Sequence, residues 1–108
     1  MTVYGKLVRD RIPEIITANG ELPKVRVLEP QEVLPALIAK LHEEADELGS
    51  AEPVDRLDEL ADVYEVLASL TATLGFTEDQ VAEAAATKRK ARGGFTHHLW
   101  LDEVTPTT

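Results

Sequence analysis

The 108-residue sequence contains no cysteine, which excludes a disulfide framework, a cysteine-based zinc site and a cysteine nucleophile. It also lacks any apolar run that approaches the length of a membrane-spanning helix. The first residues show no apolar signal-peptide core, and no phosphate-binding glycine loop is present. We therefore expect a soluble, cytoplasmic protein that has no membrane partner.

Basic residues are scarce in the middle of the chain, and the formal net charge is −9. Residues 30–87 contain two Lys or Arg against fourteen Asp or Glu, whereas residues 1–29 contain five against four and residues 88–108 four against two. Because binding to a nucleic-acid phosphate backbone requires a basic surface, we expect this acidic chain to have no nucleic-acid partner. The basic ends could meet the acidic middle and contact phosphate groups. The length predicts a single domain over residues 1–108.

Hydrophobic periodicity predicts a mainly all-α fold, a helical bundle with one or two short β-strands. The helix of residues 53–74 is apolar over more than half of its circumference, which indicates a homodimer interface, with a tetramer as the alternative. A capping-box pattern at residues 77–80 starts the last helix. The predicted elements are helices over 11–18, 30–48, 53–74 and 77–92, strands over 24–28 and 98–101, and a turn over 49–53.

Two acidic pairs are the strongest functional signal. Glu44 and Glu47 are three residues apart on one predicted helix, and Glu59 and Asp62 are three apart on the next. Residues at this spacing share a helix face, and a short turn makes the two helices antiparallel neighbours. Four carboxylates can then converge on a hard divalent cation. We predict a Mg²⁺ site, with Mn²⁺ as the alternative ion, and these four residues as metal-binding and catalytic groups.

Glu43 and Asp46 adjoin the first pair but fall on a more exposed arc of the helix. Plain solvation is the simpler interpretation of both. Glu43 could still support the ligands or orient a water molecule, and it is therefore kept as a catalytic candidate.

Basic residues at both ends are candidates for phosphate binding. Lys88 and Arg92 share a helix face, although cations at a helix C-terminus are also favoured by the helix dipole alone. Near the N-terminus the candidates are Lys6, Arg9 and Arg11, for which an ordinary surface role is the default interpretation.

The sequence also resembles a known family. The pattern Glu-Glu-x-x-Glu followed by Glu-x-x-Asp on consecutive helices resembles the MazG-like, all-α nucleoside triphosphate pyrophosphohydrolase superfamily. The segments 4–16 (YGKLVRDRIPEII) and 88–95 (KRKARGGF) look like its phosphoribosyl-ATP-pyrophosphohydrolase-like, or predicted house-cleaning, branch. Two features depart from that pattern: Gly5 stands where Asn is expected, and the interval between the acidic pairs is short.

The resemblance implies a helical bundle completed by dimerisation and Mg²⁺ held by Glu44, Glu47, Glu59 and Asp62. It also implies hydrolysis of a nucleotide between its α- and β-phosphates. This activity could serve house-cleaning, that is, the hydrolysis of non-canonical nucleotides. Phosphoribosyl-ATP is the alternative substrate. A non-catalytic helical module that binds nucleotide or dimerises is the alternative of another class.

Overall fold

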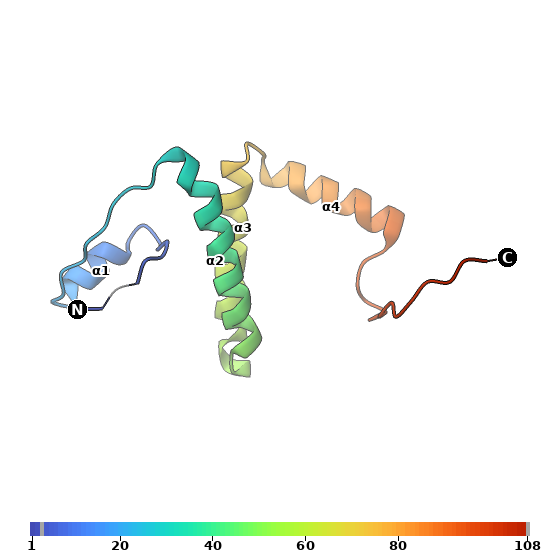
Figure 1. The fold of residues 1–108 in the computed structure, drawn as a ribbon, viewed down its shortest axis with the longest axis horizontal. Coiled ribbons are helices and arrows are strands. Elements are labelled where there is room, and N and C mark those ends of the chain that lie inside the picture. The colour runs from blue at the N-terminus through green and yellow to red at the C-terminus, as the bar shows by residue number, and fades with distance from the viewer. Residues whose placement is uncertain (3, 108) are drawn as a thin grey trace. The chain divides into compact units, whose positions relative to one another are not determined.

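A computed structural model describes residues 1–2 and 4–107. The described residues form four α-helices and no β-strand, which confirms the predicted all-α class (Figure 1). None of these helices combines the length and the hydrophobicity needed to cross a membrane. The helices are α1 (Ile12–Ala18), α2 (Pro30–Ser50), α3 (Arg56–Thr73) and α4 (Glu78–Arg92), and a 3₁₀ turn, η1 (Pro53–Asp55), precedes α3.

The chain divides into two compact units. The first, Met1–Phe76, contains α1, α2 and α3, and the second begins at Thr77 and contains α4 and the C-terminal segment. In the second unit α4 starts with the predicted capping box: the Gln80 backbone N–H donates to Thr77 Oγ1 at 3.1 Å, and the Thr77 N–H donates to Gln80 Oε1 at 2.8 Å. The single domain over residues 1–108 stays a prediction.

The first unit is organised by α2 and α3, which run antiparallel and side by side (Figure 1). Its buried core is small and consists of Leu37 from α2 with Val66 and Leu70 from α3. Leu7, from the segment before α1, packs against this core. That contact anchors the N-terminal segment to the helix pair, and it determines where the basic residues flanking Leu7 lie.

The connection between α2 and α3 lies two residues later than predicted. A turn was expected over residues 49–53, but α2 continues to Ser50. The Ser50 hydroxyl donates to the backbone carbonyl of Asp46 at 3.1 Å, within the last helical turn. Pro53 then opens η1, because a proline at the first helical position gives up no hydrogen bond. The tight connection keeps the acidic segments of the two helices close together.

Neither predicted strand forms. The alternation over residues 24–28 has no strand to pair with, and an isolated strand is not stable in water. Its Arg26 instead binds both carboxylate oxygens of Glu32, at 3.0 and 2.9 Å, while Glu32 accepts the backbone N–H of Glu29 at 3.0 Å. These bonds lower the pKa of Glu32 to about 2 and cap α2. Residues 98–101 fail for another reason, because His98 has a φ of 55°, outside the extended region.

Candidate metal centre

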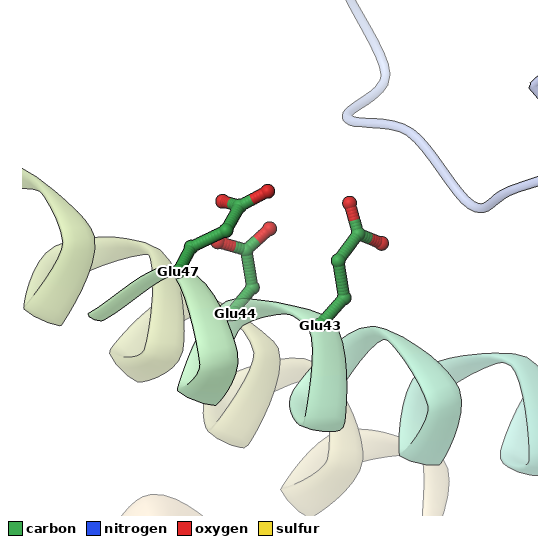
Figure 2. Close-up of side chains that lie close together, drawn as sticks. All are labelled: Glu43, Glu44 and Glu47. Carbon is green, nitrogen blue, oxygen red and sulfur yellow. The ribbon is translucent and has the colours of Figure 1, made fainter. Parts of the chain in front are cut away.

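Three carboxylates gather on one side of α2. Glu43, Glu44 and Glu47 each offer an oxygen, and these oxygens lie within 4.8 Å of one another. Figure 2 shows the three side chains projecting from the same side of the helix. Glu43 was placed on a more exposed arc by the sequence pattern, whereas in the structure it is a half-buried member of this group.

A second group of carboxylates connects the two helices. Oxygens of Glu44 from α2 and of Glu59 and Asp62 from α3 also lie within 4.8 Å of one another. Glu44 therefore belongs to both groups. The structure brings all four residues of the predicted acidic pairs together, because the short connection sets the end of α2 against the start of α3. We call the five residues of the two groups the acidic cluster.

Burial separates Glu44 from an ordinary surface glutamate. Its exposed fraction is 5%, and it is the one buried charged residue of the described chain. Within the described residues, Glu44 Oε2 and Glu59 Oε2 are buried and have no hydrogen-bond partner. A buried carboxylate oxygen without a partner is costly unless a cation compensates it. Oxygen donors of this kind suit a hard divalent ion, so the residues present fit the predicted Mg²⁺ or Mn²⁺.

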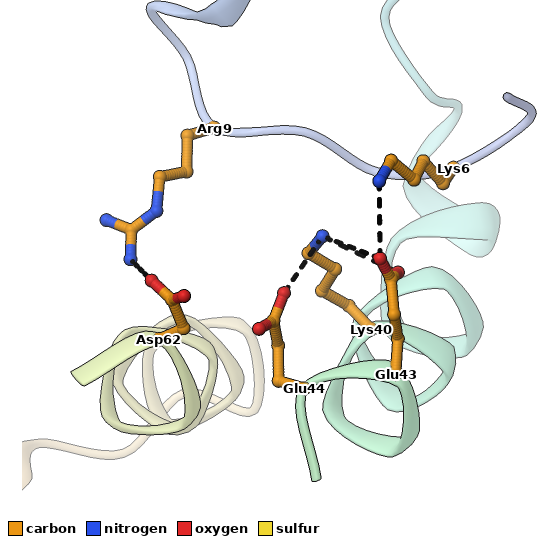
Figure 3. A network of polar contacts seen from close by, with 6 residues as sticks. All are labelled: Lys6, Arg9, Lys40, Glu43, Glu44 and Asp62. Carbon is orange, nitrogen blue, oxygen red and sulfur yellow. Dashed lines mark hydrogen bonds and ion pairs between the residues drawn. The ribbon is translucent and has the colours of Figure 1, made fainter. Parts of the chain in front are cut away.

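The N-terminal segment carries two cations to the acidic cluster. Arg9 donates to Asp62 Oδ1 at 2.6 Å, and Lys6 donates to Glu43 Oε1 at 3.3 Å. Figure 3 shows the segment passing over both helices, with the two side chains reaching down to the carboxylates. Two of the predicted phosphate-binding residues thus lie at the candidate metal centre.

Lys40 is a member of the site that the sequence analysis missed. Its Nζ lies 3.1 Å from Glu44 Oε1 and 3.5 Å from both carboxylate oxygens of Glu43 (Figure 3). Burial acts to lower the pKa of Lys40, but the bonds to Glu44 and Glu43 outweigh it and leave the pKa raised. The ammonium therefore stays charged. The signal was present in the sequence as i,i+3 and i,i+4 spacings from Lys40 to the acidic pair.

Glu47 lies at the exposed edge of the acidic cluster. The negative charge of Glu44 is the largest influence that raises the pKa of Glu47, with burial and the charges of Glu59 and Glu43 adding to it. Such repulsion between carboxylates is what a bound cation relieves.

Arg11 and Asp46, in the first unit, are not members of the acidic cluster. Arg11 is largely exposed and forms an ion pair with Glu14 within the first turn of α1. Asp46 is exposed, as expected for plain solvation. Lys88 and Arg92 lie on α4 in the second unit, where both are exposed.

Two hollows adjoin the cluster in the first unit. One, of about 250 Å³, lies between the N-terminal segment and α2, and its lining includes Lys6, Lys40 and Glu43. The other, of about 420 Å³, is lined by Arg9 and by α3 residues that are mostly apolar, among them Leu60 and Tyr64. Both hollows therefore border a cation that is bonded to the acidic cluster.

Comparisons with known proteins give one partial similarity. No family model and no solved structure matches the chain. A stretch of 51 residues is 52% identical to an uncharacterized protein of Mycolicibacterium smegmatis (strain ATCC 700084 / mc(2)155), and the match covers 47% of this chain. The chain spans about half the length of that relative, with 52% of it matched. Since the relative's name states no activity, function is inferred from the residues of this chain.

Proposed function

We propose that the protein is a Mg²⁺-dependent nucleotide pyrophosphohydrolase of the MazG-like type, with Mn²⁺ as an alternative ion. It cleaves a nucleoside triphosphate between the α- and β-phosphates and releases a nucleoside monophosphate and pyrophosphate. The observation that carries the proposal is the buried carboxylate of Glu44, shared by both groups, with an oxygen that has no hydrogen-bond partner among the described residues. The choice of the α–β bond rests on the family resemblance.

The chain's own residues would divide the work as follows. Glu44, Glu59 and Asp62 would hold the cation, and Glu47 would complete its surroundings from the exposed edge. When bound, the ion would polarise phosphoryl oxygens and favour ionisation of the attacking water. Glu43, which is bonded to Lys6 and Lys40, would orient that water or a lysine.

Phosphate binding would fall to Lys6 and Arg9. Both are exposed enough to move, with side-chain exposed fractions of 41% and 56%, and Arg9 is bonded to Asp62, a carboxylate that a metal ion would neutralise. Phosphoryl transfer depends mostly on positioning and charge neutralisation, so cations at the edge of the metal centre are the groups it requires. Lys88 and Arg92 remain candidates on α4.

We also propose a homodimer, because α3 presents an apolar seam that the rest of the first unit leaves exposed. Leu57, Leu60, Tyr64, Leu67 and Leu74 recur at intervals of three, four or seven residues, and their exposed fractions lie between 47% and 77%. This spacing is that of a helix-packing seam. Since the first unit buries so few apolar side chains of its own, a second copy is the partner we expect. The proposed nucleotide substrate implies a cytoplasmic enzyme.

The test is a panel of canonical and modified nucleoside triphosphates, with phosphoribosyl-ATP included, incubated with the protein and Mg²⁺. We expect equal amounts of monophosphate and pyrophosphate, with no product when EDTA is present. Glu59→Gln should abolish turnover. Asp46→Asn, which neutralises an exposed carboxylate on α2, should leave turnover unchanged. Turnover that survives in Glu59→Gln would refute the site, and nucleotide binding without turnover would favour a non-catalytic module.

A further inference from the structure

Basic side chains of the same chain contact the acidic cluster. Its five carboxylates, at positions 43, 44, 47, 59 and 62, are contacted by three basic side chains, Lys6, Arg9 and Lys40. Among the described residues, two of the five negative charges are left without a cationic partner. A single divalent cation matches that excess.

The three cations are not evenly distributed over the cluster. Lys40 and Lys6 both contact Glu43, and Lys40 also contacts Glu44 Oε1 (Figure 3). The oxygens of the Glu43 side are therefore already bonded to ammonium groups. The partnerless oxygens, Glu44 Oε2 and Glu59 Oε2, belong instead to the group that joins the two helices.

Lys40 is the cation best held in place. Its side chain is only 16% exposed, against 41% for Lys6, and it reaches two carboxylates from one turn earlier on the same helix. A largely buried lysine side chain on the same helix as its partners loses less conformational entropy on pairing than a flexible surface lysine does. An incoming ion would have to displace Lys40 to use both Glu43 and Glu44 as ligands.

We propose that Lys40 is a built-in counter-cation that closes the group of Glu43, Glu44 and Glu47 to a second metal ion, so that each chain binds one divalent ion, at Glu44, Glu59 and Asp62 with Glu47 at its exposed edge. The inference rests on the proposed metal centre and specifies its stoichiometry. Lys40 is a positioning residue: it fixes Glu44 Oε1 and leaves Oε2 for the ion. Any further Mg²⁺ needed in the reaction would then arrive with the nucleotide phosphates.

The experiment counts Mn²⁺ ions in the full chain without nucleotide, by equilibrium dialysis and by the electron paramagnetic resonance signal of free Mn²⁺. We expect one ion per chain in the wild type and in Lys40→Arg, which keeps the charge. Lys40→Met, which keeps the apolar stem, should bind two. Glu43→Gln should bind one ion with an affinity changed less than about threefold, because Glu43 is not a ligand in this account.

The double variant Lys40→Met/Glu43→Gln should return to one ion, since the opened group has then lost a carboxylate. Circular dichroism checks that each variant is folded, and if Lys40→Met does not fold, Glu43→Gln decides the matter. Two ions in the wild type, one ion in a folded Lys40→Met, or a tenfold weaker site in Glu43→Gln would each overturn the inference. Two ions with intact turnover would leave the proposed function standing. One ion without turnover would overturn the function alone, and no ion would overturn both.

Discussion

Neutralising Glu44 should separate metal binding from folding. Glu44→Gln keeps the size of the side chain and an oxygen that can still accept from Lys40, but it removes the charge shared by both groups of carboxylates. In the metal-free protein, the weakened bond to Lys40 is opposed by relief of the repulsion with Glu47. We therefore expect the free energy of unfolding without metal to change by no more than about 1 kcal/mol.

With metal the two proteins should differ clearly. A ligand at a concentration of 100 times its Kd stabilises the folded state by about 2.7 kcal/mol. For a unit of this size, about 1 kcal/mol shifts Tm by roughly 4–8 °C, so saturating Mn²⁺ should raise the wild-type Tm by about 10–20 °C. Glu44→Gln should lose nearly all of that shift because the ion loses its central ligand.

The assay is thermal unfolding followed by circular dichroism at 222 nm, with Mn²⁺ varied and ionic strength held constant. Ca²⁺-free buffer and an EDTA blank define the metal-free Tm. Asp46→Asn is the matched control, because it removes one exposed carboxylate from the same helix outside both groups. A full Mn²⁺-induced shift in Glu44→Gln, or an equal loss in Asp46→Asn, would refute the assignment of Glu44 as the shared ligand.

Three further predictions concern other parts of the structure. The pKa of Glu32 is lowered on folding to about 2, so its contribution to stability is present above the unfolded value near 4.5 and is lost as the pH falls through the folded value. Glu32→Gln should therefore lower Tm at pH 7 but not at pH 2, and an equal loss at both pH values would contradict the role of the Arg26 bond. Arg9→Gln should tighten Mn²⁺ binding by up to about fivefold, since the ion no longer competes with the guanidinium for Asp62, and it should raise KM for the nucleotide. Metal titration measures the first effect and steady-state kinetics the second. Weaker Mn²⁺ binding in this variant would show that Arg9 does not compete with the ion. Leu60→Glu should convert the proposed dimer to a monomer in size-exclusion chromatography with light scattering. Leu22→Glu, a change at an exposed position between α1 and α2, should leave the dimer intact. A monomeric wild type would exclude the dimer.

The acidic cluster was predictable because each step of its geometry is local. Spacing within each pair fixes the helix face, and the apolar stripes of the two helices determine which faces meet. A short connection does the rest by making α2 and α3 antiparallel. The same logic explains why the helix boundaries were close, although α2 runs to Ser50, two residues beyond the predicted end.

Other features of the site could not be predicted from sequence, because they depend on contacts between residues distant in the chain. Arg9 and Lys6 lie over the acidic cluster because Leu7 packs on the helix core, a contact that no local pattern reveals. The importance of Lys40 depends on the burial of Glu44, without which the pair would be an ordinary surface i,i+4 pair. The strand expected at residues 24–28 failed because alternation indicates a half-buried strand only when a partner strand exists.

The most direct test of the account is a crystal of the protein grown with Mn²⁺, measured at a wavelength where the ion scatters anomalously. The account predicts one anomalous peak per chain, within coordination distance of carboxylate oxygens from Glu44, Glu59 and Asp62, with Lys40 still bonded to Glu43. The absence of a peak between α2 and α3 at saturating Mn²⁺, or a peak bound by neither Glu44 nor Glu59, would contradict it.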